Sequence, residues 1–178
     1  MKYSKNNPVQ ISAHFNSREF ICQCGKNHEI ELNTKLVDNL EKLYAMLKCS
    51  KIIITSGVRC AQHSVAVGGY ASDEHVKGNA ADVMCYGQDG KIIDSKIVCC
   101  AAQLIGFAGI GRISATATHV DVSTTRTWKG DEMSGTTNTV TSDFFTYFNI
   151  AKTSLCGNVE NTVEILINGK SVYKGAFS

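Results

Sequence analysis

This sequence lacks the features that most quickly assign a chain to a membrane or nucleic-acid class. No apolar run is long enough to span a bilayer. The basic start "MKYSKNNPVQISAHF" is not followed by an apolar stretch, so it does not resemble a secretory signal. Lys and Arg are scattered and the net charge is only +2, which gives no argument for nucleic acid. We therefore expect a protein made in the cytoplasm that binds neither membrane nor nucleic acid.

The chain is long enough to bury a real core. Its 178 residues are 43% apolar, which suits one domain, or one domain with a small appendage. No internal repeat is visible, and we expect a monomer.

The eight cysteines do not form an obvious disulfide framework, because cytosolic thiols are kept reduced. Cys49, Cys85, Cys99 and Cys100 stand among apolar residues and are expected to be small buried side chains. A thiol-redox function has weak support, since neither Cys22-x-Cys24 nor Cys99-Cys100 has the C-x-x-C spacing of thiol oxidoreductases.

The stretch "FICQCGKNH" offers Cys22, Cys24 and His28 as possible metal ligands. A structural zinc site needs four ligands, and no second Cys/His pair follows at once. A strand or loop with alternating cysteines is the simpler interpretation.

Hydrophobic periodicity predicts an α+β domain. Residues 32–47 have the apolar spacing of an amphipathic helix, with Asn33 as its N-cap, and 95–105 form a second helix that ends near Gly106. The segments "KIIITSG", "AADVMCYG", "FAGIGRI" and "THVDVS" read as short strands. Together they predict a small, largely antiparallel sheet with flanking helices, ending near Trp128.

The composition changes after this domain. We expect residues 1–129 to form the main domain, 130–142 to be a linker or surface loop rich in Ser, Thr and Gly, and 143–178 to be a small β-rich element. Asn168-Gly169 lies between two strand-like runs and predicts a β-hairpin.

The most informative candidate residues are His75, Asp82 and His119. Gly78 lets the loop after His75 fold back toward Asp82, which lies in a predicted strand. Two histidines and a carboxylate form a three-ligand zinc set that leaves a position open for water, as a catalytic site requires. A zinc ion there would lower the pKa of that water and polarise a carbonyl.

The flanking motifs strengthen this hypothesis. "ITSGVRC", "VGGYASDEHVKGNAADV" and "GIGRI…THVDVSTTRTW" follow one another in order, after the opening "FNSREFICQCG". Over residues 14–128 the chain resembles the zinc D-Ala-D-Ala carboxypeptidases and phage L-alanyl-D-glutamate endopeptidases. The resemblance implies a hedgehog-like fold, zinc held by His75, Asp82 and His119, and a peptidoglycan peptide as substrate. It also implies that Arg59 points into the cleft, where a guanidinium suits a substrate carboxylate.

The general base is the point at which the sequence departs from these relatives. Several have a carboxylate three residues before the last histidine, or a histidine two before, whereas Thr116 and Ala117 stand here. Asp121 is the best replacement, since residues two apart on a strand share a face. It can act as base or orient a ligand histidine, or simply pair with Arg126. His63 and Glu74 are weaker candidates.

Asp73 also stands where many relatives have serine, which makes the rim of the cleft more acidic. We expect a zinc peptidase of the bacterial cell wall, either endolysin-like or a D,D-carboxypeptidase. The alternative is a non-catalytic zinc module that binds wall peptide or a protein partner.

Overall fold

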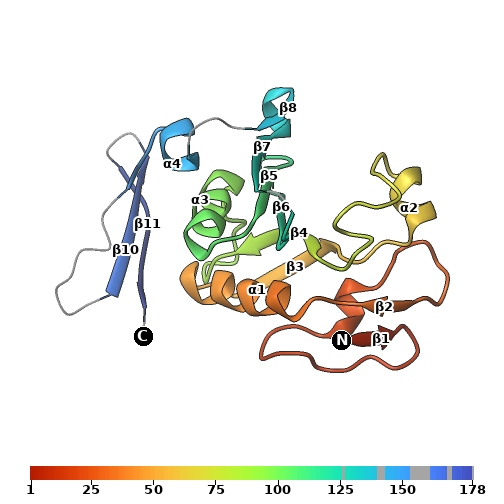
Figure 1. Ribbon diagram of the computed structural model, residues 1–178. Helices are drawn as coiled ribbons and strands as arrows, with labels where there is room; N and C mark the ends of the chain where they lie inside the picture. The colour runs from red at the N-terminus through yellow and green to blue at the C-terminus, as the bar shows by residue number, and fades with distance from the viewer. Residues whose placement is uncertain (126, 140–142, 153–160, 168–169, 178) are drawn as a thin grey trace.

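The computed structural model describes residues 1–125, 127–139, 143–152, 161–167 and 170–177, of which 136–139, 151–152, 161–167 and 170–177 are described by their backbone alone (Figure 1). The helices are α1 (Thr34–Met46), α2 (Ala61–Ala66), α3 (Ser95–Ile105) and α4 (Phe144–Tyr147), with the 3-10 turns η1 (Ser17–Phe20) and η2 (Glu132–Ser134). The strands are β1 (Lys2–Ser4), β2 (Glu29–Glu31), β3 (Lys51–Ser56), β4 (Ala80–Tyr86), β5 (Gly109–Arg112), β6 (Thr118–Asp121), β7 (Trp128–Asp131), β8 (Thr136–Thr139), β9 (Ile150–Lys152), β10 (Asn161–Ile167) and β11 (Lys170–Phe177). The predicted mixture of helices and strands is confirmed.

A six-stranded mixed sheet forms the centre, in the order β3-β4-β6-β5-β7-β8. Its pairs are antiparallel except β5 with β7, which run parallel. The predicted "largely antiparallel" sheet is therefore right, with one parallel pair that local sequence patterns did not indicate. Strands β1 and β2 form a separate two-stranded sheet at the N-terminus.

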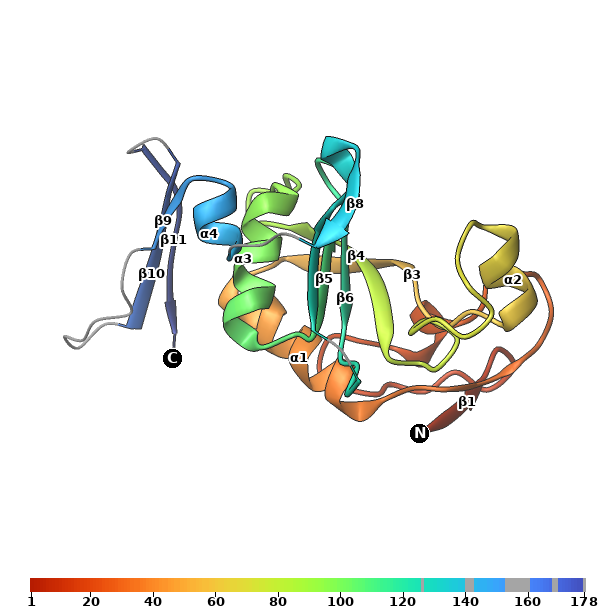
Figure 2. The ribbon, with the colours of Figure 1, turned by 45° about the horizontal axis from the view of Figure 1, so that its top comes forward.

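Helices α1 and α3 lie on one face of the central sheet (Figures 1 and 2). Helix α1 begins at the predicted cap Asn33, which accepts a hydrogen bond from the Lys35 backbone N–H. Helix α3 begins at Asp94, for which no cap was predicted and which accepts from the Lys96 backbone N–H in the same way. Alternate strand residues turn toward these helices and are buried there, among them Ala81, Val83, Cys85, Ile110 and Val120. The residues between them, including Asp82 and His119, therefore face the other side of the sheet.

The four cysteines expected in the core are buried there: Cys49, Cys85, Cys99 and Cys100 are each at most 1% exposed. The seven cysteines that the structure describes are all free thiols.

The segment expected to be a linker instead extends the sheet. Trp128–Asp131 pairs with β5, and Thr136–Thr139 pairs with β7. A buried ion pair, Arg112 Nη1 to Asp131 Oδ1 at 3.6 Å, joins β5 to β7. Composition rich in Ser, Thr and Gly signals turns, but it does not reveal which backbone edge a short segment can pair with. Residues 140–142 lie outside the described part of the chain.

Beyond this sheet, α4 packs on α3 and buries Phe144 and Phe145 in the main core. Strands β10 and β11 pair antiparallel, as the hairpin prediction required, and β9 joins β10. The turn residues Asn168 and Gly169 lie outside the described residues. The division of the chain into a peptidase domain and a separate C-terminal element stays a prediction.

None of the helices in the described ranges has the length and apolar character needed to cross a membrane.

Candidate metal centre

Asp82 and His119 are directly opposite each other on neighbouring strands. The antiparallel register of β4 and β6 pairs Asp82 with His119, and directly opposite residues point to the same face. His119 Nδ1 lies 2.9 Å from Asp82 Oδ1. Strand pairing thus brings together two candidate ligands that are 37 residues apart in the sequence.

His75 comes from the loop that precedes β4, and its ring is fixed from behind. Its Nδ1 lies 2.8 Å from the Gly57 carbonyl, so Nδ1–H donates there and Nε2 keeps its lone pair. Gly78 has the positive φ of +72° that lets this loop turn, and a Cβ there would lie 1.8 Å from the Glu31 carbonyl oxygen. The predicted role of Gly78 is confirmed.

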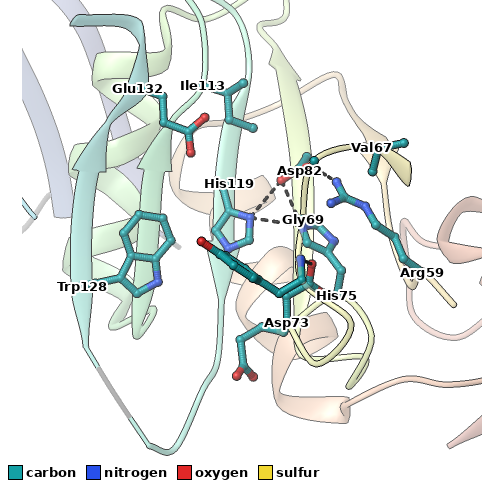
Figure 3. Close-up of a pocket in the computed structure, with 13 residues that line it drawn as sticks. Arg59, Val67, Gly69, Asp73, His75, Asp82, Ile113, His119, Trp128 and Glu132 are labelled. Carbon is teal, nitrogen blue, oxygen red and sulfur yellow. Dashed lines mark hydrogen bonds and ion pairs between the residues drawn. The ribbon is translucent and has the colours of Figure 1, made fainter. Parts of the chain in front are cut away.

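Three ligand atoms therefore converge, and the donor set fits zinc. His75 Nε2 lies 3.3 Å from Asp82 Oδ1 and 3.2 Å from His119 Nδ1. Two imidazole nitrogens and one carboxylate oxygen are a ligand set of catalytic zinc sites. All three side chains are largely buried, and Figure 3 shows them pointing toward one another at the floor of a cleft.

Arg59 lines the same cleft, as expected, but it also holds a ligand. Its Nη2 donates to Asp82 Oδ2 at 2.8 Å and its Nε donates to Ser56 Oγ at 2.8 Å. The second oxygen of Asp82 is thus fixed, which leaves Oδ1 turned toward the two histidines. A guanidinium carries five N–H donors, so these two bonds leave it able to bind a further carboxylate.

Asp121 shares the face of His119, as the strand period predicts, but it lies behind the ring. Its Oδ2 is 3.5 Å from His119 Nε2, the nitrogen that does not face Asp82. Asp121 is fully buried, and it accepts hydrogen bonds from Trp128 Nε1 at 3.0 Å and from the Ser123 backbone at 2.9 Å. This geometry fits a carboxylate that orients a ligand histidine better than one that meets substrate water. Arg126, its predicted alternative partner, lies outside the described residues.

Glycines in β5 make room for Trp128 next to His119. A Cβ at Gly109 would lie 1.9 Å from Asp121 Oδ2 and 2.3 Å from Trp128 Nε1, and one at Gly111 would lie 2.9 Å from the indole ring. The Trp128 ring consequently lies 5.5 Å from the His119 ring, centroid to centroid. Gly109 and Gly111 in the "GIGR" segment thus leave the space in which the Trp128 ring packs and reaches Asp121.

The carboxylates around His119 set the charge of the site. Burial alone lowers the pKa of His119, but hydrogen bonds and charges from Asp121 and Asp82 outweigh it and raise that pKa to about 9. Burial likewise opposes ionisation of Asp82, yet hydrogen bonds from His119 and His75 hold its pKa well below the usual range. The two carboxylates thus favour a positive charge at the position of His119.

The cleft above the ligands has a volume of about 400 Å³. Tyr70, which is 79% exposed, and Trp128 are aromatic residues on its walls. Glu132, at the start of η2, also lines it, and Figure 3 shows its carboxylate turned toward the side that holds Ile113 and His119. Sequence reasoning missed Glu132 because it lies in the segment expected to be a linker.

The weaker candidates for the general base are either held by hydrogen bonds to other residues or absent from the cleft. The buried Glu74 accepts hydrogen bonds from Lys77 Nζ at 2.7 Å and from Asn79 Nδ2 at 2.8 Å. His63 lies in α2 and is not among the residues that line the cleft. Asp73 lines the cleft, but it binds the Ser64 hydroxyl and the Val76 backbone N–H.

Thr116 and Ala117 lie in the turn between β5 and β6. The backbone N–H groups of both residues donate to Ser114 Oγ there. Neither side chain can take a proton, as the sequence indicated.

Comparison with known families supports this assignment of the site. The family model described as Peptidase M15 matches residues 13–121, which include Arg59, the three candidate ligands and Asp121. Among curated proteins, none matches this chain. Trp128 and Glu132 come after the matched stretch.

Proposed function

Because this chain belongs to the Peptidase M15 family, we propose that it is a zinc-dependent peptidase that hydrolyses an amide bond in peptidoglycan stem peptides or cross-links. The convergence of His75 Nε2, Asp82 Oδ1 and His119 Nδ1 at the floor of an open cleft carries this proposal. The sheet with α1 and α3 on one face and the ligands on the other supports the hedgehog-like fold that we propose for residues 14–128.

The three ligands would hold the metal, and their surroundings keep them in position. Gly57, Arg59 and Asp121 each bind the far side of one ligand. When bound, zinc supplies Lewis-acid polarisation of the substrate carbonyl and lowers the pKa of water. Rigid supporting hydrogen bonds favour this chemistry because the ligands need no rearrangement when the substrate binds.

The proposed class of substrate is inferred from the residues that line the cleft. Arg59 offers a guanidinium that suits a carboxylate, which stem peptides carry, and Tyr70 and Trp128 offer aromatic surface to the peptide. We propose that the protein acts on the bacterial cell wall as a monomer. Either an endolysin-like endopeptidase or a D,D-carboxypeptidase is compatible with these walls.

Glu132 is our candidate for the general base. A base must lie within reach of the attacking water, and geometry decides this before pKa does. Glu132 is an exposed carboxylate on the cleft wall, whereas Asp121 is fully buried behind His119. In this scheme Glu132 takes the proton of the attacking water and passes it to the departing amine.

Digestion of purified cell walls tests the function directly. The protein is incubated with peptidoglycan with and without a zinc chelator, and the soluble products are identified by mass spectrometry. We expect new amine and carboxyl ends at one type of amide bond, lost with chelator and restored by zinc. The masses also name the bond that is cut.

The non-catalytic alternative is supported by Thr116 and Ala117. These residues stand where several relatives carry the general base, and neither side chain can accept a proton. Zinc-dependent binding to wall peptide without any cleaved product would support that alternative and overturn the peptidase. Absence of zinc binding would overturn both.

A further inference from the structure

We propose that Cys22, Cys24, His28 and Cys60 form a second, structural zinc site, independent of the proposed peptidase activity. One ligand atom of each lies within 4.8 Å of every other. Ligands of a tetrahedral Cys₃His site lie roughly 3.5–4 Å apart, given zinc–sulfur bonds of about 2.3 Å. The described cluster is therefore already close to the size that a zinc ion needs.

Cys60 supplies the ligand that the sequence did not reveal. Cys22, Cys24 and His28 come from the loop between η1 and β2, where Gly25 has a φ of +83° and lets the chain turn. Cys60 lies 38 residues after Cys22, at the N-cap of α2. The fold thus completes a four-ligand set from an incomplete local motif.

The polar surroundings of the sulfurs suit thiolates. The Cys60 backbone N–H donates to Cys22 Sγ at 3.3 Å, and the His63 backbone N–H donates to Cys60 Sγ at 3.4 Å. His28 Nε2 lies 3.0 Å from Cys24 Sγ. Backbone donors that point at ligand atoms orient them and stabilise their negative charge, as the outer contacts of metal sites do.

A metal explains this arrangement better than other thiol chemistry. A disulfide would use two of the three sulfurs and would give His28 no role. Three thiolates and one imidazole complete the coordination of zinc, which is typical of a structural rather than a catalytic site. Cys22 is 4% exposed, and the other three ligands are partly buried.

The site would tie the N-terminal segment to the wall of the catalytic cleft. Cys60 directly follows Arg59, and the same loop contains Gly57, whose carbonyl orients His75. Besides the bond from Cys60 to Cys22 Sγ, two hydrogen bonds outside the cluster join these segments, from the Val58 backbone to the Phe20 carbonyl at 2.8 Å and from Gln23 Nε2 to the Thr55 carbonyl at 2.9 Å. A zinc ion would add a cross-link that does not depend on either bond.

Cobalt substitution separates this site from the catalytic one, because only this site contains sulfur. Reduced protein is loaded with Co²⁺, and the near-ultraviolet absorption is recorded. We expect thiolate-to-cobalt charge-transfer bands in the wild type and in His119→Ala. We expect the bands to be lost in the double variant Cys24→Ser, Cys60→Ser. Their absence from reduced wild-type protein would overturn the proposal without relying on any variant.

Zinc content and thermal stability give a second measurement. Wild type should hold about two zinc ions per chain, and Cys24→Ser and His119→Ala about one each. Cys99→Ala is the matched control, since Cys99 is buried outside both clusters, and it should keep about two. His119→Ala can hold zinc only in the cysteine site, so chelation should lower its melting temperature by at least about 5 °C. Adding Cys24→Ser to that variant should abolish this response.

Two results would contradict a second zinc site. One is a wild-type content of about one zinc ion that falls to none in His119→Ala. The other is a disulfide between two of the cluster cysteines in freshly purified protein, shown by thiol titration and peptide mapping. The peptidase assay is separate, so failure of either proposal leaves the other intact.

Discussion

His119 lies between two carboxylates, with Asp82 Oδ1 2.9 Å from its Nδ1 and Asp121 Oδ2 3.5 Å from its Nε2. The two carboxylates therefore have different tasks. Asp82 belongs with the ligand atoms, and Asp121 fixes the ring from the opposite edge. Each can be changed separately, which makes their roles distinguishable by experiment.

Asp121→Asn should weaken zinc binding by about 10–100-fold, because a ligand histidine loses the partner that orients it. Hydrolysis should be largely restored when zinc is added in excess. Competition with a chromophoric chelator measures the affinity. If the variant stays inactive at saturating zinc, Asp121 takes part in proton transfer, as the sequence first suggested.

Glu132→Gln should lower kcat by about 10²–10⁴-fold, the usual contribution of a general base. Zinc content should not change, because Glu132 is not one of the three converging ligands. Steady-state kinetics and metal analysis on the same preparation check both statements. Glu74→Gln is the matched control, a carboxylate that lines the cleft but is held by Lys77 and Asn79. Equal losses in the two variants would remove the case for Glu132.

Arg59→Lys keeps the positive charge but loses the planar fork that can bind a carboxylate through two hydrogen bonds. We expect kcat/KM for a peptide with a free carboxylate to fall by about tenfold or more. The amidated form of the same peptide should be affected much less. If both peptides lose activity equally, Arg59 acts on Asp82 alone.

The metal-free protein should lose stability as the pH rises from about 6.5 to about 9. The pKa of His119 is raised from 6.5 to about 9 in the folded chain, so its stabilising charge is fully present below pH 6.5 and is lost by pH 9. Urea unfolding in chelator across this range measures the loss, which should be on the order of a few kcal/mol. In Asp121→Asn, where one carboxylate is gone, the loss should occur at lower pH.

Gly109→Ala should destabilise the fold by about 1–3 kcal/mol and weaken zinc binding, because a methyl group there overlaps Asp121 and Trp128. Gly87→Ala is a milder control, since its Cβ would meet the Asp89 carboxylate at 3.1 Å, at the end of an exposed side chain, and the Lys91 carbonyl oxygen only at an ordinary contact distance of 3.9 Å. Chemical denaturation and zinc titration of both variants make the comparison. Equal effects would argue against the role of Gly109 in making room for Asp121 and Trp128.

The sequence alone predicted the features that depend on local pattern. Helix α1 begins after Asn33 as its cap indicated, and the period of β6 placed Asp121 on the same face as His119. The candidate ligands His75, Asp82 and His119 were indicated by the order of the flanking motifs, and the structure brings their ligand atoms together. Caps and strand periods are encoded within a few neighbouring residues, and ordered motifs can be read along the chain, so both are visible without knowledge of the fold.

Long-range partnerships could not be predicted in the same way. The register of β4 and β6 places Asp82 opposite His119, and the ring then turns Nδ1 toward Asp82 and Nε2 toward Asp121, so that Asp121 lies behind the ring. The parallel pairing of β5 and β7 brought Glu132 to the cleft from an expected linker. Cys60 lies beside the N-terminal cysteines because η1 packs beside β3, a contact between segments that are far apart in the sequence.

Two stretches of the chain contribute different residues to the cleft. All three candidate ligands lie within residues 13–121, whereas Trp128 and Glu132 lie on the β7–η2 segment just beyond. The strands β4 and β6 would hold the metal, whereas the segment just after the matched stretch carries Glu132, the proposed general base. A change confined to Glu132 can therefore silence the catalyst and leave a zinc-binding protein behind, so loss of activity in evolution needs no loss of the metal.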